Sequence, residues 1–389
     1  MKKTVLSLAL AAVALVASAQ SQSAEDLVFT PVKENPITSV KNQSRSGTCW
    51  GFSALGFFES ELIRIGKGEH DLAESFVVHH TMLDRARQSV RTHGDVSFSQ
   101  GGSFYDVIYA WQQYGIVPQS AMAAPGSLYG DTLYNHNELA ATAEAYVASI
   151  AKGKQKKLSP IWNKTLVNLY DNYLGEVPAE FTYQGKKYTP KSFAASLGLN
   201  MDDYVSITSF THHPFYKQFV IEVPDNWRWA LSYNIPLDEL MRTMKHAVET
   251  GYTIAWGSDV SESYFGRDGV AKDPTTTAAD AKGSDAARWT GTDVTSGVGG
   301  GKLLGNITQE MRQEAYDNWE TTDDHGMQIY GIAKDQHGKE YFMVKNSWGN
   351  AGKYNGIFYA TYPFVAYKTM NIVVHKNAIP KDIRKKLGI

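Results

Sequence analysis

The sequence predicts an α+β protein with two lobes, the first built mainly from helices and the second mainly from strands. Residues 48–200 carry apolar positions at helical spacing, whereas alternating strand patterns dominate from Tyr204 onward. The chain has 389 residues, of which 43% are hydrophobic and 20% charged, as is usual for a globular protein. At roughly 150 residues per domain, this length predicts two or three units. We expect the functional residues in the crevice between the lobes, where pockets usually form.

The charge balance argues against several classes of protein. The 38 Lys and Arg nearly match the 40 Asp and Glu, so no nucleic-acid partner is expected. No apolar run after residue 19 reaches the roughly 18 residues that a membrane span needs. The lysine-rich run 152–157 is interpreted as a short solvated linker, with a weak nucleic-acid patch as the less favoured alternative.

Residues 1–19 have the pattern of a signal peptide. Lys2 and Lys3 form a basic start, an apolar stretch comes next, and Ala17-Ser18-Ala19 is a small-residue cleavage site. We therefore expect export to the periplasm or the outside of a bacterium. A membrane anchor is disfavoured because the apolar run is short and no cysteine directly follows the cleavage site, and a buried N-terminal helix is disfavoured by the signal-peptide pattern as a whole.

The remaining elements are expected in order along the chain. Residues 20–120 are expected to form the helical lobe, residues 121–200 a helical insertion, and residues 201–389 the strand-rich lobe. Residues 257–305 are rich in Gly, Asp, Thr and Ala and predict a long surface loop. The glycine run at 297–302 lacks the pattern of a phosphate-binding loop, so no nucleotide site is expected. Helices are predicted at Leu72–Val90, Phe104–Tyr114, Glu138–Ala151, Trp162–Tyr173 and Leu237–Thr250.

The single cysteine, Cys49, stands just before or in the first turn of a predicted amphipathic helix. In an exported protein, an unpaired cysteine is an intermolecular bridge or a reactive thiol. A helix N-terminus stabilises a thiolate, which favours a nucleophile. Gln43 lies in the loop that enters this helix, where its amide is able to donate to an oxyanion together with the Cys49 N–H. A buried cysteine that serves only as a small hydrophobe is the alternative, and position alone leaves both interpretations open.

A partner base for the thiol must come from elsewhere in the chain. The pairs His79-His80 and His212-His213 are interpreted as core or surface residues and not as a ligand set, because a metal site needs further ligands at suitable spacing. His325 instead begins an alternating strand pattern, and Asn346 ends the next one. Two adjacent antiparallel strands are able to bring these side chains together, and an amide would then fix the imidazole tautomer.

These segments together resemble the signatures of the papain-like cysteine peptidases. The matching residues are Gln43, the segment 47–50, Asp324-His325 and the segment 346–349, in the family's order. The resemblance implies a papain-like fold, with the cysteine helix in an α lobe and the His and Asn in a β-barrel-like lobe. It also implies a Cys49–His325–Asn346 triad acting through a thioester, with Gln43 at the oxyanion. Contacts with a peptide substrate are implied for Gly101, Gly102, Asp324, Trp348 and Trp50, and no metal or other cofactor is expected. A loop turn is the alternative for the two glycines, and a loop acid without a role is the alternative for Asp324.

Three departures narrow the resemblance to the bleomycin hydrolase or aminopeptidase C branch. Ser46 replaces the usual disulfide cysteine, and only thirty residues (49 minus 19) separate the expected cleavage site from Cys49, too few for a pro-segment. His325 lies 276 residues after Cys49 (325 minus 49), against roughly 130 to 150 in short papain-type enzymes. The segments 185–193, 202–205, 236–240 and 251–257 are similar to that branch as well. The branch implies aminopeptidase action and a possible homo-oligomeric ring.

The C-terminal segment differs from that branch, in which an arm places its carboxylate in the cleft and holds the substrate amine. Here a last strand is predicted at 371–375, and a short helix after Pro380 uses most of the remaining residues. An open cleft suited to endopeptidase cleavage is therefore the alternative activity. A secreted peptide-binding protein without catalysis is disfavoured because all four chemical groups are present. A redox role for Cys49 is disfavoured because no resolving cysteine exists.

Overall fold

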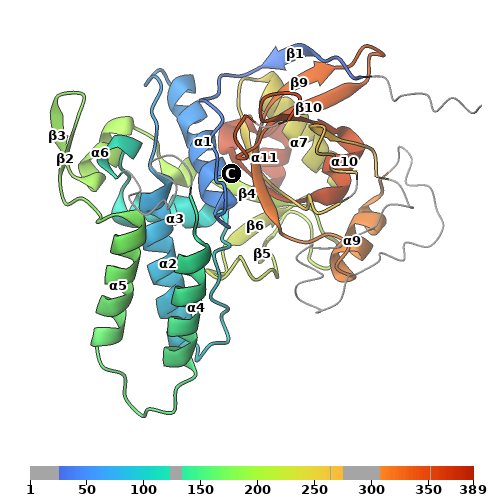
Figure 1. Cartoon of the computed structure of the whole chain (residues 1–389). Helices are drawn as coiled ribbons and strands as arrows, with labels where there is room; N and C mark the ends of the chain where they lie inside the picture. Colours follow the sequence, from blue (N-terminus) through green and yellow to red (C-terminus); the bar gives the residue numbers. More distant parts are fainter. Residues whose placement is uncertain (1–25, 123–133, 263, 275–306, 351) are drawn as a thin grey trace, which may run out of the picture.

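The computed structural model describes residues 26–122, 134–262, 264–274, 307–350 and 352–389. Helices α1 to α6 lie on one side of the molecule, and a large sheet with its covering helices lies on the other (Figure 1). The predicted α+β fold class is confirmed. The signal-peptide pattern and the glycine run at 297–302 fall outside the described residues.

The helical side combines helices packed around α1 with a second layer that extends away from the sheet. Figure 1 shows α4 and α5 as an antiparallel pair that reaches the lower tip, alongside α2. The elements are α1 (Cys49–Arg64), α2 (Glu74–Arg91), α3 (Phe104–Tyr114), α4 (Asn137–Ala151), α5 (Ile161–Leu174), β2 (Phe181–Tyr183), β3 (Lys186–Tyr188) and α6 (Pro190–Leu197). The residues expected to form a helical insertion thus also contain the hairpin β2–β3.

Helix α1 is buried on nearly all sides because it packs between the other helices and strand β9 (His325–Lys334). The sequence predicts an amphipathic helix, but Glu59 and Glu61 are also buried. Glu59 accepts from the backbone N–H of Leu72 at 2.9 Å, and Glu61 from the hydroxyl of Tyr204 at 3.1 Å. Hydrogen bonds of this kind are what allow carboxylates to lie inside a core. The helix that carries the cysteine is therefore packed against neighbouring elements along most of its length.

Nine strands of the second half, in the order β5-β6-β4-β12-β7-β9-β10-β11-β8, form one mixed sheet, and β1, which pairs with β9, is its tenth strand. Among the described residues no pairing closes this order into a barrel, so the lobe expected to be barrel-like is an open sheet. The strands are β1 (Thr30–Glu34), β4 (Tyr204–Thr208), β5 (Gln218–Val220), β6 (Leu231–Asn234), β7 (Ile254–Ser258), β8 (Val270–Ala271), β10 (Glu340–Lys345), β11 (Ile357–Thr361) and β12 (Thr369–His375).

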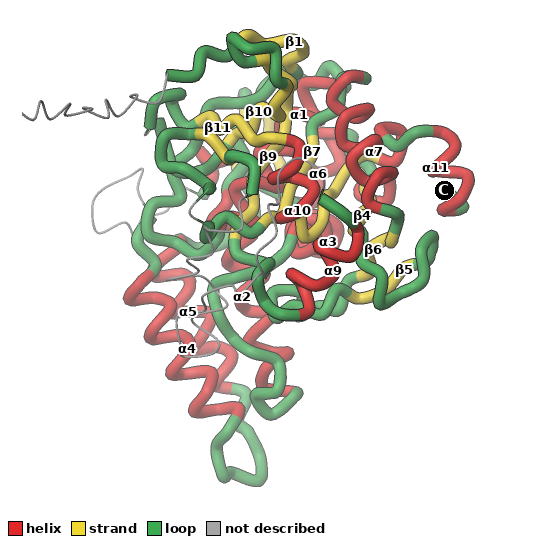
Figure 2. The backbone as a smooth tube through the Cα atoms, turned by 90° about the vertical axis from the view of Figure 1, so that its right-hand side faces the viewer, coloured by secondary structure: helices red, strands yellow, loops and turns green. Residues whose placement is uncertain are grey.

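Helices α7, α9, α10 and α11 accompany the sheet, and Figure 2 shows α7 and α11 side by side near the C-terminus. Their bounds are α7 (Leu237–Glu249), α9 (Gln309–Asp317), α10 (Tyr362–Lys368) and α11 (Lys381–Leu387). Helix α7 packs against β7 and β9. Arg242 of α7 pairs with Asp382 of α11 at 2.5 Å, so the last helix lies on α7. The predicted long loop 257–305 contains β8 in its described part, and most of it lies outside the described residues.

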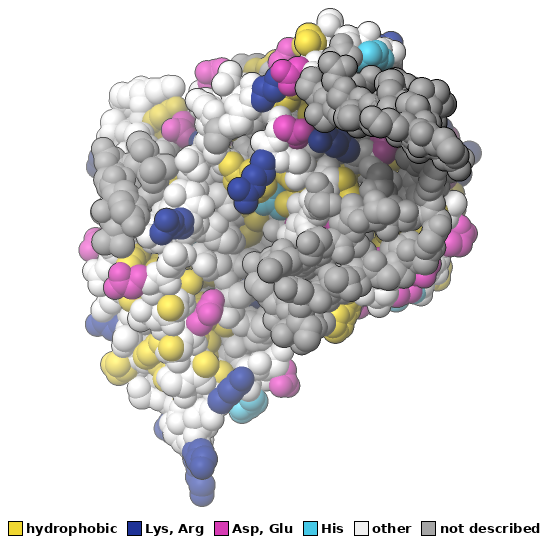
Figure 3. Space-filling view, turned by 45° about the vertical axis from the view of Figure 1, so that its right-hand side comes forward, with side chains coloured by type: hydrophobic (Ala, Val, Ile, Leu, Met, Phe, Trp, Pro, Cys, Tyr) yellow, Lys and Arg dark blue, Asp and Glu magenta, His cyan; other side chains and the backbone are white. Residues whose placement is uncertain are grey.

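Two expectations from composition concern the surface. Residues 152–157 are exposed in the connection between α4 and α5, and Figure 3 shows Lys and Arg side chains at that tip. Within the described ranges, no helix is both long and apolar enough to cross a bilayer.

Candidate active site

A cleft of about 1110 Å³ opens between the helical side and the sheet. Its walls come from several separate stretches of chain, and they include Gln43, Cys49, Gly101, Gly102 and His325. Distant parts of the sequence that carry the predicted signatures thus meet at one place. The structure brings together the residues for which the resemblance predicts chemistry.

Cys49 is the first residue of α1 and is half-buried at the cleft wall. The helix begins here because Thr48 leaves helical geometry at the N-cap while its carbonyl already accepts from the backbone N–H of Gly51 at 2.9 Å. Cys49 therefore lies at the positive end of the helix dipole, as the sequence predicts. The described part of the chain contains no second cysteine, in agreement with the composition.

His325 and Asn346 form a hydrogen-bonded pair. His325 is the first residue of β9, and Asn346 comes directly after the last residue of the neighbouring antiparallel strand β10. The distance from His325 Nε2 to Asn346 Oδ1 is 2.8 Å, so the ring donates to the amide oxygen. Trp348 packs against the His325 ring, with the two ring centres 4.9 Å apart. The other imidazole nitrogen, Nδ1, remains for the cleft, as a general base requires.

Gln43 is joined to the same turn that carries Asn346. Its backbone N–H donates to the Ser347 carbonyl at 2.8 Å, and its side-chain Oε1 accepts from the Ser347 hydroxyl at 2.5 Å. The Nε2 group donates to the Ser46 carbonyl at 2.7 Å, which uses one of its two N–H bonds. The second N–H is the donor that an oxyanion role requires. The loop before α1 and the turn after β10 are therefore held as one unit.

The local environment favours uncharged forms of the thiol and the imidazole. Burial raises the pKa of Cys49 to about 12, and the charges of Asp323, Asp225 and Asp324 add to the rise, while a backbone hydrogen bond from Gly326 opposes it. Burial also lowers the pKa of His325 to about 4, against the effect of the bond to Asn346. Both shifts act against the thiolate that the position at the helix N-terminus favours. A neutral His325 is free to accept the thiol proton.

Gly101 and Gly102 line the cleft, but neighbouring side chains explain why glycine stands there. A Cβ atom on Gly101 would lie 2.0 Å from Asp225 Oδ2, and one on Gly102 would lie 2.8 Å from Trp50 Cε2. Trp50 is itself buried, and its indole N–H donates to the Gln100 carbonyl at 3.0 Å. Trp50 thus packs against Gly102 and is hydrogen-bonded to Gln100, which precedes the two glycines.

Asp324 is predicted to contact substrate, but its carboxylate is engaged by the protein. It accepts from the backbone N–H groups of Val260 at 2.9 Å and Ser261 at 3.1 Å, and from the Ser261 hydroxyl. Burial, the largest cause, and the charge of Asp259 raise the pKa of Asp324 well above its usual value. These contacts hold the loop after β7 beside the start of β9.

Two further acidic residues of the cleft escape sequence reasoning. Burial, together with the charge of Asp225, raises the pKa of Asp323 to about 7. Asp225 pairs with the buried Arg85 at 3.2 Å and lies against Gly101. Nothing in the sequence places residue 225 near the cysteine, since 176 residues (225 minus 49) separate them. Asp323, by contrast, directly precedes the predicted Asp324-His325 motif, so its place near the active site could have been predicted from the sequence.

The first histidine pair has structural partners, as the sequence predicts. His79 is buried, and its Nε2 lies 2.7 Å from Asp171 of α5. His80 stacks on Tyr114 at a ring distance of 4.0 Å. Both therefore belong to the packing between α2 and its neighbouring helices. The second pair, His212 and His213, has a different environment.

Comparisons with known proteins agree with this arrangement. The model of the peptidase C1-like family matches residues 2–276 and 289–388. Aminopeptidase G of Lactobacillus delbrueckii subsp. lactis is 22% identical, and the match covers 91% of this chain and 85% of the relative. Aminopeptidase C of Streptococcus thermophilus is 24% identical, and the match covers 93% of this chain and 85% of the relative. The crystal structure of PepW from Lactobacillus rhamnosis HN001 has a TM-score of 0.68 at 20% identity, covering 92% of this chain and 84% of that one.

Proposed function

Because the chain belongs to the peptidase C1-like family, we propose that it is a cysteine peptidase that removes N-terminal residues from peptides. The observation that carries this proposal is that His325, which is hydrogen-bonded to Asn346, lines the same cleft as the only cysteine. The relatives named as aminopeptidases C and G support the same class of reaction.

In the proposed reaction, Cys49 Sγ attacks the carbonyl carbon of the scissile bond while His325 takes the thiol proton. The carbonyl oxygen becomes an oxyanion that the Cys49 N–H and the second N–H of Gln43 stabilise. The C–N bond then breaks, His325 delivers its proton to the leaving amine, and a thioester remains on Cys49. A water molecule, deprotonated by His325, hydrolyses the thioester and restores the thiol.

Two neighbours position the base in this scheme. Asn346 fixes the ring orientation and tautomer of His325, as the acid does in a serine triad. Trp348 covers one side of the imidazole and limits the access of water to this hydrogen bond. Neither residue needs to touch the substrate for this purpose.

The acidity of the cleft supports action on a free N-terminus. Six of its lining residues are carboxylic acids, and among the described lining residues none is Lys or Arg. The six are Glu144, Glu222, Asp225, Asp317, Asp323 and Asp324. A protonated amine is attracted to such a site, whereas a substrate carboxylate is repelled. Asp323 and Asp225 line the same cleft as Cys49, and they are the groups we propose to attract the amine of a bound peptide.

The assay compares one aminoacyl fluorogenic substrate with its N-acetylated form, in the wild type and in Cys49→Ala. We expect turnover of the free amine at least about tenfold faster than of the blocked form, because the acetyl group removes the charge. We expect no turnover in Cys49→Ala, and normal turnover in His93→Asn, which replaces a histidine at the end of α2 outside the cleft.

Each part of this proposal has its own contradicting result. Hydrolysis that survives in Cys49→Ala excludes the thioester route. Faster cleavage of the blocked substrate, or cleavage inside a long peptide, identifies the open-cleft endopeptidase instead.

We further propose that the protein is exported and cleaved after Ala19, on the basis of the pattern in residues 1–19. N-terminal sequencing of protein recovered from the periplasm and the medium of a bacterial host tests this. A mature chain that starts at Gln20 agrees with the proposal, and a cell-bound chain that keeps Met1 contradicts it.

A further inference from the structure

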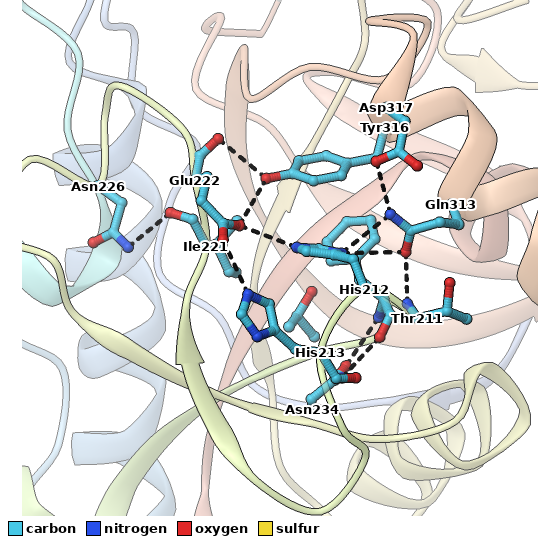
Figure 4. Close-up of polar contacts among 12 residues, drawn as sticks. Thr211, His212, His213, Ile221, Glu222, Asn226, Asn234, Gln313, Tyr316 and Asp317 are labelled. Atoms are coloured by element: carbon cyan, nitrogen blue, oxygen red, sulfur yellow. Dashed lines mark hydrogen bonds and ion pairs between the residues drawn. The ribbon is translucent and has the colours of Figure 1, made fainter.

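A second group of ligating side chains lies at the outer rim of the cleft. His212 and His213 come after strand β4, and Glu222 comes after strand β5, which brings the three side chains together across one loop (Figure 4). The side chains converge from both sides of this loop, and Gln313 and Tyr316 of α9 approach them from one side. The sequence supplied only the two adjacent histidines. The fold adds the third potential ligand.

The three side chains point their ligating atoms at one another. His212 Nε2 lies 3.1 Å from Glu222 Oε2, and His213 Nε2 lies 3.0 Å from Glu222 Oε1. The three ligand atoms all lie within 4.8 Å of one another. Tetrahedral zinc with bonds of about 2.0 to 2.1 Å holds its ligand atoms about 3.3 Å apart. The two His–Glu distances already match this spacing, and the two imidazole nitrogens, at most 4.8 Å apart, would move closer by up to about 1.5 Å to hold such an ion.

A surrounding layer of contacts holds the two imidazoles. The Nδ1 atom of His212 lies 3.3 Å from Gln313 Oε1 and 3.1 Å from its Nε2, and the backbone N–H of Thr211 donates to the same Oε1 at 2.5 Å. His213 stacks on Phe219 with ring centres 4.3 Å apart. In metal sites, a partner at the second ring nitrogen orients the ligand histidine and sets its tautomer. Gln313 is positioned to act in this way.

We propose that His212, His213 and Glu222 bind one divalent transition-metal ion of the zinc type. The donors would be the two Nε2 lone pairs and the carboxylate, with solvent completing the coordination, since all three side chains reach the surface. Two nitrogen donors favour zinc over calcium or magnesium, which prefer oxygen ligands.

The position of this site gives it a structural consequence. Glu222 lines the cleft together with Tyr316 and Asp317 of α9, and the Tyr316 hydroxyl donates to the Glu222 carbonyl at 3.1 Å. The ion would tie the loop 211–222 together and, through Gln313, hold it against α9. It would therefore fix one rim of the cleft without entering the chemistry at Cys49. Because the ion would bind the folded protein and not the unfolded chain, it would also raise the unfolding temperature.

The test is zinc titration of the full chain by calorimetry after dialysis against a chelator. The protein is made without a histidine tag and in the Cys49→Ala background, so that neither a tag nor the thiol takes up zinc. We expect one equivalent to bind and the unfolding temperature to rise. His213→Gln and Glu222→Gln should each weaken binding at least about tenfold, whereas the control variant His93→Asn should bind as the parent does.

Other results overturn the proposal. The site does not exist if zinc fails to saturate at one equivalent, or if both ligand variants, shown by circular dichroism to be folded, bind as tightly as the parent. If zinc binding is weaker only in His93→Asn, the ion binds elsewhere on the surface and not at His212, His213 and Glu222.

Discussion

At the scale of single residues, the orientation of His325 decides which nitrogen faces the thiol. Nε2 is committed to Asn346, so only Nδ1 is able to serve as the base. The sequence predicts this pair because a strand begins at one residue and a strand ends just before the other. The direction of the pKa shifts of Cys49 and His325 could not be predicted from the sequence. These shifts depend on burial and, for Cys49, on acidic residues from distant segments.

Replacing Asn346 tests the positioning role. A hydrogen bond of this kind contributes about 1 kcal/mol or more, and about 1.4 kcal/mol corresponds to a factor of ten in rate. We therefore expect Asn346→Ala to lower kcat about tenfold with little change in KM, because the ring turns away from the thiol. Unchanged thermal unfolding shows that the fold persists, and an unchanged kcat contradicts the role.

Asp323 should give the binding of substrate a pH dependence. Its pKa is raised to about 7, so the carboxylate is largely protonated below that pH and ionised above it. Because only the ionised form attracts the substrate amine, KM should fall as the pH rises from about 5.5 to 7, a range in which an α-amino group stays mostly protonated. Asp323→Asn should remove this trend and raise KM at pH 7.5 about tenfold.

The matched control for this experiment is Asp95→Asn, an exposed aspartate outside the cleft. If KM depends on pH in Asp323→Asn as it does in the wild type, another group binds the substrate amine.

At the scale of elements, the approach of β9 to the first turn of α1 sets the geometry between the base and the thiol. Gly326 makes this approach possible. A Cβ atom there would lie 2.6 Å from Ser53 Oγ and 3.2 Å from Phe104 Cε1, so it would displace these side chains or move β9 away from the first turn of α1.

Gly326→Ala should therefore cost much activity while leaving a folded protein. A misplacement of about 1 Å in a catalytic group is able to lower the rate by about a hundredfold, and we expect kcat/KM to fall by that order. Gly51→Ala is the control, since its Cβ would meet only Val78 Cγ2 at 3.9 Å. Steady-state kinetics of both variants measure the effect, and equal activity in the two contradicts it.

Elements with strong local signals were predictable, whereas those set by long-range packing were not. Phe104–Tyr114 agrees with the predicted helix because Ser103 and Asp106 form a capping box and Gly115 ends the helix. The burial of Glu59 and Glu61 on α1 was not predictable, because their partners Leu72 and Tyr204 come from other elements. The short strand β8 is defined by pairing with β11 and not by its own sequence.

At the scale of the whole molecule, the cleft combines segments that the sequence order keeps far apart. Motifs reveal Cys49, His325 and Asn346, because chemistry requires particular residue types beside recognisable helix and strand ends. The acidic wall from residues 144, 222, 225, 317 and 323 depends on sheet order and on where α4 and α9 pack. The same dependence explains why Glu222 joins the two histidines only in the folded chain.

The most direct test of the central claim, that Cys49 is the nucleophile of this cleft, is the mass of the covalent intermediate. The enzyme is mixed with an aminoacyl ester, quenched in acid within the first turnover, and examined by intact and peptide mass spectrometry. We expect the protein to gain the mass of one aminoacyl group, located on the peptide that contains Cys49, and Cys49→Ala to gain none. Turnover of the ester with no added mass, or with the acyl group on a different residue, would contradict the claim.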